Sequence, residues 1–86
     1  MDEISLPILL EVISPEETIA SVRVASVELP GAMGRFMVKK DHAALLSSLV
    51  RGDIVYRTGD GGPERIAIGS GFVQVCDNKV TACVEL

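Results

Sequence analysis

The sequence predicts an all-β protein, a small antiparallel β-sandwich of about eight to ten short strands. Apolar and polar residues alternate in most of the short runs, which is the period of a half-buried strand. The 8 glycines and 4 prolines are spread along the chain at intervals, as turn residues between short strands are. The 86 residues make one domain, residues 1–86, and a hydrophobic content of 48% is sufficient for one packed core.

The first part of the chain is expected to form strands that change phase once. Residues 8–13 alternate as a strand, and Ser14-Pro15-Glu16 then turns the chain because proline fixes φ at the second turn position. In the next run the inward side chains have one parity up to Val24 and the opposite parity from Val27 onward. This change of phase requires a bulge or a bend between Val24 and Val27, and Pro30-Gly31 ends the run.

Three shorter strands are expected in the middle of the chain. Residues 34–39 alternate, and residues 53–57 and 65–68 read as the two arms of a hairpin. Residues 58–63, which contain three glycines and a proline, connect these arms as a turn by composition alone.

The clearest pattern is a closing hairpin around a two-residue turn, Asp77-Asn78. Counting outward from that turn places Cys76 opposite Lys79 and Cys83 opposite Phe72. The two cysteines then lie too far apart for a disulfide, which fits a reducing compartment. The side chains expected on the inner face of this hairpin are Val73, Val75, Val80, Ala82 and Val84.

One segment, residues 45–50, does not fit either period cleanly. Its apolar side chains are spaced more like a helix than a strand, but the run is short and Gly52 cuts it off. A helix of this length is marginal without tertiary support, so the residues alone leave the conformation open.

Composition and charge exclude several classes of function. The net charge is −4 and the basic residues do not cluster in one run, so nucleic acid and anionic lipid headgroups are poor partners. No apolar run approaches the roughly 18 residues of a membrane span, which excludes direct membrane insertion. The acidic start Met1-Asp2-Glu3 is unlike a secretory signal, and we interpret the protein as cytoplasmic. A single histidine and two cysteines are too few for a zinc site, and no cofactor is expected.

Catalytic chemistry is also not expected. His42 is the one group that titrates near neutral pH, with Asp41 before it and Ser47 after it. Adjacent residues of an extended chain point to opposite faces, so Asp41 is badly placed to orient His42, and no Gly-x-Ser-x-Gly elbow is present. A hydrogen-bonded structural or interface histidine is the favoured interpretation.

Two further patterns have a plain and a functional interpretation. Gly69-Ser70-Gly71 superficially resembles part of a dinucleotide loop, but a strand and not a helix is expected to follow it. Close backbone approach or a bulge between strands explains these glycines better. Arg35, Lys39 and Lys40 form a small basic group that is either solvated or a docking contact for acidic loops of a partner.

Several short motifs, taken in order, resemble one known family over nearly the whole chain. These motifs are Ser14-Pro15-Glu16, Gly34-Arg35-Phe36, His42-Ala43-Ala44-Leu45-Leu46, Gly52, Phe72-Val73-Gln74-Val75 and Asn78-Lys79-Val80-Thr81. The ordered set resembles the β-sandwich domain of the epsilon subunit of F-type ATP synthases. By this resemblance the chain is a short form that lacks the C-terminal helical hairpin of longer members. The Pro-Gly that commonly precedes the family's histidine is Lys40-Asp41 here.

The resemblance implies a non-catalytic rotor subunit of the central stalk that couples ion-driven rotation to ATP synthesis. It implies that the domain packs on the gamma subunit and seats on the c-ring, peripherally, at the cytoplasmic face of the inner membrane. Ser14, His42 and Ser47 match positions on or near the gamma-facing side. Arg35 matches a ring-proximal position at which many bacterial members carry an acidic residue. Residues 45–50 are then expected to be extended, and inhibition by an extended hairpin is not expected.

The alternative is a stand-alone β-sandwich module that binds a small ligand or a protein. A ligand-binding module requires a concave pocket with convergent polar groups. A rotor subunit requires instead a broad, mostly flat apolar patch.

Overall fold

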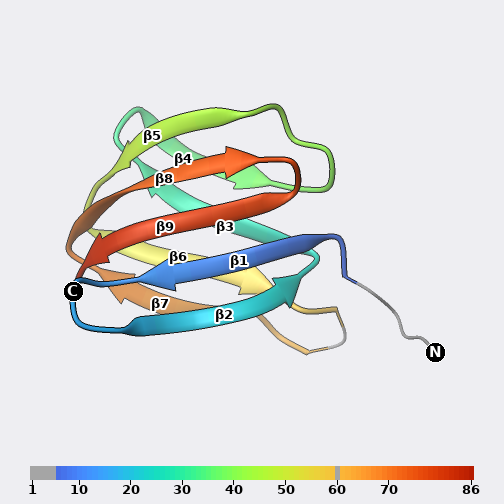
Figure 1. Ribbon diagram of the computed structural model, residues 1–86, viewed down its shortest axis with the longest axis horizontal. Coiled ribbons are helices and arrows are strands. Elements are labelled where there is room, and N and C mark those ends of the chain that lie inside the picture. Colours follow the sequence, from blue (N-terminus) through green and yellow to red (C-terminus); the bar gives the residue numbers. More distant parts are fainter. Residues whose placement is uncertain (1–5, 60) are drawn as a thin grey trace.

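The computed structural model describes residues 6–59 and 61–86, which form nine strands and no helix (Figure 1). The strands are β1 (Ile8–Ile13), β2 (Thr18–Val24), β3 (Ser26–Gly31), β4 (Gly34–Val38), β5 (Leu45–Leu49), β6 (Gly52–Arg57), β7 (Glu64–Ile68), β8 (Ser70–Cys76) and β9 (Lys79–Glu85). The expected all-β architecture and number of strands are confirmed. This part of the chain accordingly offers no helix long and apolar enough to cross a membrane.

The strands form one curled sheet that folds over into two layers (Figure 1). The first layer has the order β2-β1-β9-β8-β5, and the second layer has the order β4-β3-β6-β7. The layers are joined where Leu49 of β5 pairs with Gly31 of β3. All strand pairs are antiparallel except β1 with β9, which is parallel. The expected antiparallel sandwich is confirmed apart from this one pair, which sequence does not predict because alternation determines the buried face of a strand but not its neighbour.

The change of phase expected between Val24 and Val27 is confirmed as a bend at Ala25. The chain passes there from β2 in the first layer to β3 in the second layer. The Ala25 N–H donates a hydrogen bond to the backbone carbonyl of Arg57, at 2.7 Å, so the bend is attached to β6. The inward side chains of β2 and of β3 therefore both point into one shared core, although they have opposite parities in the sequence.

The ambiguous segment is strand β5, as the family resemblance implies. It pairs with β8, and Leu45 and Leu49 point inward while Leu46 is 74% exposed. The helix-like spacing is misleading because half of its apolar side chains face solvent. The hydrogen bonds to β8 and the burial of Leu49 favour the extended conformation over an isolated helical turn.

The core between the layers is made of aliphatic side chains, and no described polar or charged residue is buried. Its members are Ile8, Leu10, Val12, Val24, Val27, Leu29, Val38, Leu49, Ile54, Ile68, Val73, Val75, Val80, Ala82 and Val84. Phe36, Tyr56 and Ile66 pack against this cluster from its margins. The inward positions expected from alternation are therefore confirmed in both layers.

The closing hairpin has the register expected from its sequence. Asp77 and Asn78 both adopt positive φ, at 51° and 62°, which is the geometry of a two-residue type I′ turn. Phe72 pairs with Cys83, Cys76 pairs with Lys79, and both cysteines are free thiols.

Candidate docking surface

The outer face of the first layer carries an apolar stripe. The strand registers place Phe72 beside Cys83, and Cys83 beside Ile13, on three adjacent strands. Ser48 of β5 continues this row, and Leu46 lies two residues from Ser48 on the same face. We call Ile13, Cys83, Phe72 and Leu46 the apolar stripe. Leu46 and Phe72 are 74% and 55% exposed, which is unusual for large hydrophobic side chains on a small domain.

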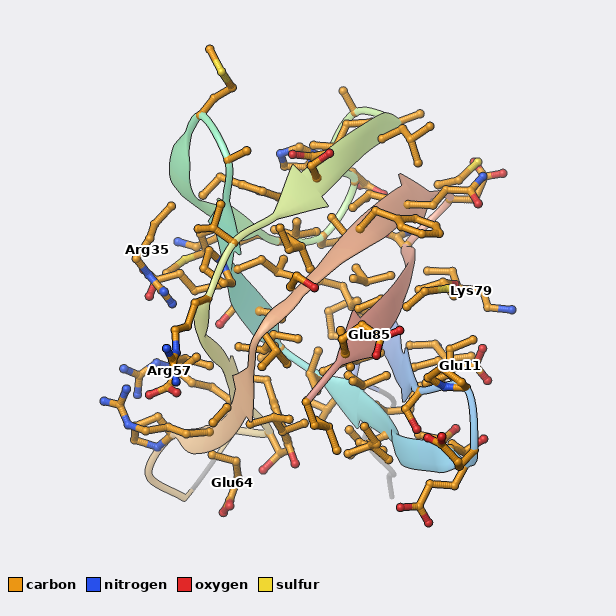
Figure 2. All side chains as sticks on the ribbon, turned by 90° about the vertical axis from the view of Figure 1, so that its left-hand side faces the viewer. Glu11, Arg35, Arg57, Glu64, Lys79 and Glu85 are labelled. Carbon is orange, nitrogen blue, oxygen red and sulfur yellow. The ribbon has the colours of Figure 1, made fainter. Side chains whose placement is uncertain are left out.

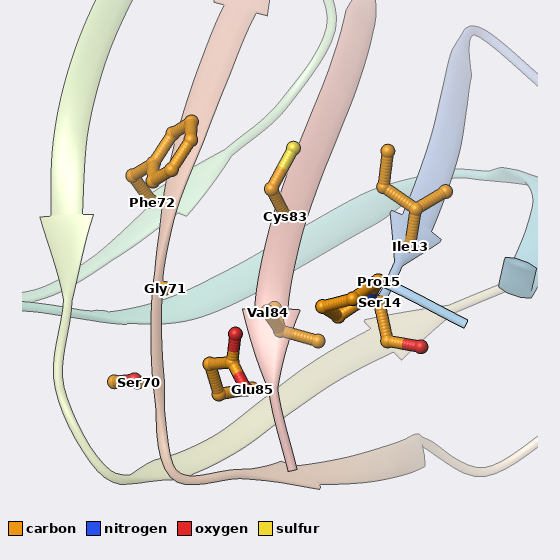
Figure 3. Close-up of a pocket in the computed structure, with 9 residues that line it drawn as sticks. All are labelled: Ile13, Ser14, Pro15, Ser70, Gly71, Phe72, Cys83, Val84 and Glu85. Carbon is orange, nitrogen blue, oxygen red and sulfur yellow. The ribbon is translucent and has the colours of Figure 1, made fainter. Parts of the chain in front are cut away.

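One end of the stripe opens into a groove of about 580 Å³, shown in Figure 3. Phe72, Cys83 and Ile13 stand in a row along it, Pro15 and Val84 lie between the strand ends, and polar groups are few. The polar lining residues are Ser14, Ser70 and Glu85. A second, smaller hollow of about 420 Å³ is lined by Leu46, Ser47, Ser48 and Phe72, so Phe72 is common to both.

Gly71 allows β8 and β9 to lie close together beneath the groove. A Cβ atom at this position would come within 2.3 Å of the backbone oxygen of Cys83 and 3.0 Å of the Val84 Cα. No side chain fits there without moving the backbone of β9. Close backbone approach is therefore the role of this glycine, and Ser70–Cys76 is the strand that was expected in place of a dinucleotide-binding helix.

Ser14 lies in the turn that follows β1, at the edge of the groove. Its N–H and hydroxyl both donate to the Glu17 carbonyl, at 2.9 Å and 3.2 Å, and its hydroxyl accepts from the Glu17 N–H at 3.3 Å. These bonds close the turn that Ser14-Pro15-Glu16 predicts.

Ser47 is half-buried at the centre of β5, on the same side as Leu45 and Leu49. Its hydroxyl donates to the Ser48 carbonyl at 3.1 Å, and it contributes to the hollow beside Phe72. The structure therefore brings Ser14 and Ser47 to the two hollows that share Phe72.

His42 lies elsewhere, in the loop between β4 and β5. Its backbone N–H donates to the Lys39 carbonyl at 3.2 Å, and its ring Nδ1 is 2.7 Å from the Ala43 carbonyl, which it reaches as a donor. Asp41 bonds Asn78 of the β8–β9 turn: its N–H donates to Asn78 Oδ1 at 2.7 Å, and its Oδ1 accepts from Asn78 Nδ2 at 3.2 Å. Asp41 thus ties two loops together and is not the orienting partner of a catalytic histidine.

Arg35, on β4, is held by groups of its own domain. Its Nε and Nη2 donate to the Glu28 carboxylate at 3.1 Å and 3.0 Å, and Nη2 also donates to the Asp53 carbonyl at 2.9 Å. The guanidinium therefore joins three neighbouring strands, β4, β3 and β6. Its side chain is still 43% exposed.

Sequence reasoning did not single out the apolar stripe, although the necessary signals were present. Phe72 has the parity opposite to the buried Val73 and Val75, and the turn at Asp77-Asn78 already places Cys83 beside it. Leu46 was hidden by the helix-like spacing of its segment. Only the parallel pairing of β1 with β9 brings Ile13 next to Cys83, and no local pattern predicts that contact.

The surface is suited to binding another protein. The described ranges contain no group of three or more His, Cys, Asp or Glu side chains that could hold a metal ion. An open apolar stripe on a stiff sandwich, with hydrogen-bonded serines beside it, is typical of a docking domain.

The class of protein is thus a small all-β sandwich domain with an exposed apolar surface, and comparison with known proteins gives its family. The family described as "ATP synthase, Delta/Epsilon chain, beta-sandwich domain" matches residues 8–85. This chain belongs to that family.

Relatives with curated names support the assignment. The ATP synthase epsilon chain of a Nitratiruptor species is 45% identical over 76 residues, which are 88% of this chain and 59% of the relative. The ATP synthase epsilon chain of Desulfitobacterium hafniense is 44% identical over 76 residues, 88% of this chain and 57% of the relative. The chain therefore spans somewhat more than half the length of the curated relatives that it matches.

Solved structures have the same fold. A chain of the Euglena gracilis mitochondrial ATP synthase (OSCP/F1/c-ring) superposes with a TM-score of 0.85 over 96% of this chain and 53% of that chain, at 22% identity. A chain of the Tetrahymena thermophila mitochondrial ATP synthase (central stalk/c-ring) gives a TM-score of 0.77 over 95% and 66%, at 15% identity.

Proposed function

We propose that this domain is a non-catalytic rotor component of the central stalk of an F-type ATP synthase, and that it couples ion-driven rotation to ATP synthesis. The apolar stripe is the observation that carries this proposal, because a rotor subunit needs a surface that stays attached to the shaft under torque. The sandwich supports the role mechanically, since a close-packed aliphatic core has low compressibility.

The proposed partner of the stripe is the gamma subunit. Leu46 and Phe72 are the anchors, since each exposes enough apolar surface to contribute about 1–2 kcal/mol when a partner covers it. Ser14 lies at the edge of the groove and supplies a polar contact at the margin. Ser47 has the inward parity of β5 but contributes to the hollow beside Phe72, and it is proposed as a contact there. His42 lies at the loop that leads into β5 and is proposed as a contact at the far end of the same interface.

The proposed ring-facing part of the domain is the end that carries the β3–β4 turn. Met33, at the tip of that turn, is 98% exposed. Arg35 stands directly after the turn, and its Nε and Nη2 groups are already used within the domain. We propose that its exposed side faces the polar loops of the c-ring, at the cytoplasmic face of the inner membrane.

The proposal extends to regulation. The described residues form nine strands and no helix, and a conformational switch needs an element with two stable positions. The sandwich is therefore proposed to support assembly and torque transfer without itself braking ATP hydrolysis.

A stand-alone ligand-binding module is less well supported. The groove has the volume of a small-molecule site, but it is open along the sheet and its polar lining residues are only three. Convergent polar groups, which fix the orientation of a ligand, are what such a site requires.

The test is binding of the purified chain to the gamma subunit. The double variant Leu46→Ser/Phe72→Ser should weaken binding by at least about tenfold, corresponding to about 1.4 kcal/mol. Met37→Ser is the matched control, because Met37 is also an exposed apolar side chain, at 42%, but belongs to the second layer. Equal affinity of the double variant and the control, with both folded, would refute docking through the stripe.

A further inference from the structure

The outer face of the second layer is basic. Its outward positions are occupied by Arg35 on β4, Arg57 on β6 and Arg65 on β7, and by the exposed Lys39 directly after β4. We call these four side chains the basic face. They make up half of the 8 lysines and arginines of a chain whose net charge is −4.

Strand registers place these cations around a small common area. Arg35 pairs with Pro30, Arg57 pairs with Ser26, and Arg65 pairs with Val55. The four residues span four adjacent strands and three side-chain rows, so three strand spacings and two row spacings separate the outermost members. With strands about 4.8 Å apart and same-face residues about 6.8 Å apart, their Cα atoms fall within a square of roughly 14 Å on a side.

Two carboxylates lie within this area and neutralise part of its charge. Glu28 accepts from Arg35 at 3.0 Å, and Asp53 is 3.7 Å from Arg65. Four cations therefore face outward against these two carboxylates and the exposed Glu64 at the start of β7, so the face keeps a positive excess. Figure 2 shows Arg35 and Arg57 on this side of the molecule, with Glu64 below them and Glu11 on the other side.

The middle row of the face carries two apolar side chains. Met37, 42% exposed, and the half-buried Val55 lie there on either side of Glu28, whose carboxylate is bonded to Arg35. A surface that combines apolar side chains with an excess of cations is complementary to a polypeptide that carries both carboxylates and apolar side chains. The phosphate backbone of a nucleic acid offers no apolar partner for these side chains, and the overall negative charge of the chain repels it.

We propose that the basic face is a second docking surface, and that its occupant is an acidic segment of a partner protein. This surface lies on the layer opposite to the apolar stripe, so the proposal goes beyond attachment to the shaft and does not depend on it. Arg35, which is paired with Glu28, marks the corner where this surface meets the proposed ring-facing end, and the acidic segment is proposed to lie on the side of Lys39, Arg57 and Arg65. Contacts on the basic face are electrostatic in large part, and binding should therefore be rapid, reversible and sensitive to salt.

The test uses the full chain and two defined peptides. Amide chemical shifts are followed while polyglutamate, or a glutamate-rich peptide with interspersed leucines, is added at low salt. Shifts should concentrate on β4, β6 and β7, and the leucine-containing peptide should bind more tightly. Lys39→Glu/Arg57→Glu should weaken binding by at least about tenfold. Arg23→Glu/Lys79→Glu makes the same change of net charge on the first layer and should leave affinity within about twofold of the unmodified chain.

Three results would overturn the proposal. The first is no saturable binding of either peptide at low salt. The second is an equal loss of affinity in the two double variants, which would show a non-specific effect of net charge. The third is that oligo-dT binds as tightly as the leucine-containing peptide, which would indicate a general polyanion site. Far-ultraviolet circular dichroism of each variant checks that the sandwich is intact.

Discussion

Removal of the Arg35 guanidinium should destabilise the domain measurably, although the residue is exposed. In the structure this side chain bonds the Glu28 carboxylate twice and the Asp53 backbone carbonyl once. Arg35→Ala removes all three bonds from a junction of three strands. From sequence alone a surface change at this position is expected to leave stability almost untouched, so the structure changes the expectation.

The expected loss in the free energy of unfolding follows from the energies of the individual contacts. An ion pair at this exposure contributes about 0.2–1 kcal/mol, and solvent screening keeps it at that level. The charge-assisted bond to the Asp53 carbonyl adds about 1 kcal/mol. Arg35→Ala should therefore lower the free energy of unfolding by about 1.5 kcal/mol, or the Tm by about 6–12 °C in a domain of this length. Arg35→Glu should cost about 1 kcal/mol more, because it sets a second carboxylate beside Glu28.

The assay is urea unfolding of a double-mutant cycle with Glu28→Gln. The coupling energy between Arg35 and Glu28 should be about 0.5–1 kcal/mol at low salt and should shrink at high salt. A loss below about 0.3 kcal/mol in Arg35→Ala, or coupling that does not respond to salt, would refute the assigned role of Arg35 in joining the strands.

The same cycle separates stability from attachment to the ring. Glu28→Gln removes the ion pair but keeps the positive charge of Arg35. If Arg35 contacts the c-ring, Arg35→Glu should impair ATP-driven ion pumping at a temperature at which both variants remain folded and assembled in the complex, and Glu28→Gln should not. Parallel defects in both variants would assign the effect to stability alone.

Four other outcomes are expected. Gly71→Ala should lower the free energy of unfolding by about 2–3 kcal/mol because its Cβ would meet the Cys83 oxygen, whereas Gly61→Ala, which has open space, should stay within about 0.5 kcal/mol; urea midpoints measure both. His42→Ala should change Tm or gamma binding but not the rate of any chemical step, and an altered step in a stable, fully assembled variant would contradict this. A reductant should not shift the melting curve of the chain because both thiols are free, and a chelator should not because the described residues contain no cluster of metal-binding side chains; a sharp drop with either would contradict this. Addition of the chain to the isolated catalytic head should leave ATP hydrolysis uninhibited, and a strong inhibition relieved by ATP would refute the proposal on regulation.

The fold could be predicted from sequence wherever the information is local. Alternation places Val73, Val75 and Val80 on the inner face, and the turn at Asp77-Asn78 sets the register of its hairpin. The opposite parities of Val24 and Val27 predict the bend between them, although not that the chain crosses there from one layer to the other. Each of these features depends on residues that are close in the sequence.

The remainder depends on contacts between distant segments. The hydrogen bonds of Arg35 to Glu28 and to the Asp53 carbonyl form only because β3, β4 and β6 pair in this register. The apolar stripe forms only because β1 lies beside β9. Period-two patterns specify which face of a strand is buried, and many arrangements of strands satisfy them equally. In the same way, Asp41 takes a positive φ of 63° and bonds Asn78, a loop-to-loop contact without any signature in sequence.

The parallel pair of β1 and β9 also affects how the domain folds during its synthesis. Of the described strands, β9 leaves the ribosome last, yet it is placed in the middle of the first layer, between β1 and β8. Until it arrives, β1 and β8 each lack a neighbour, and their unpaired edges are open to pairing with other chains. We expect a nascent chain that has not yet exposed β9 to remain unfolded or to need a chaperone, and folding to be slow because the closing contacts are the most distant in sequence.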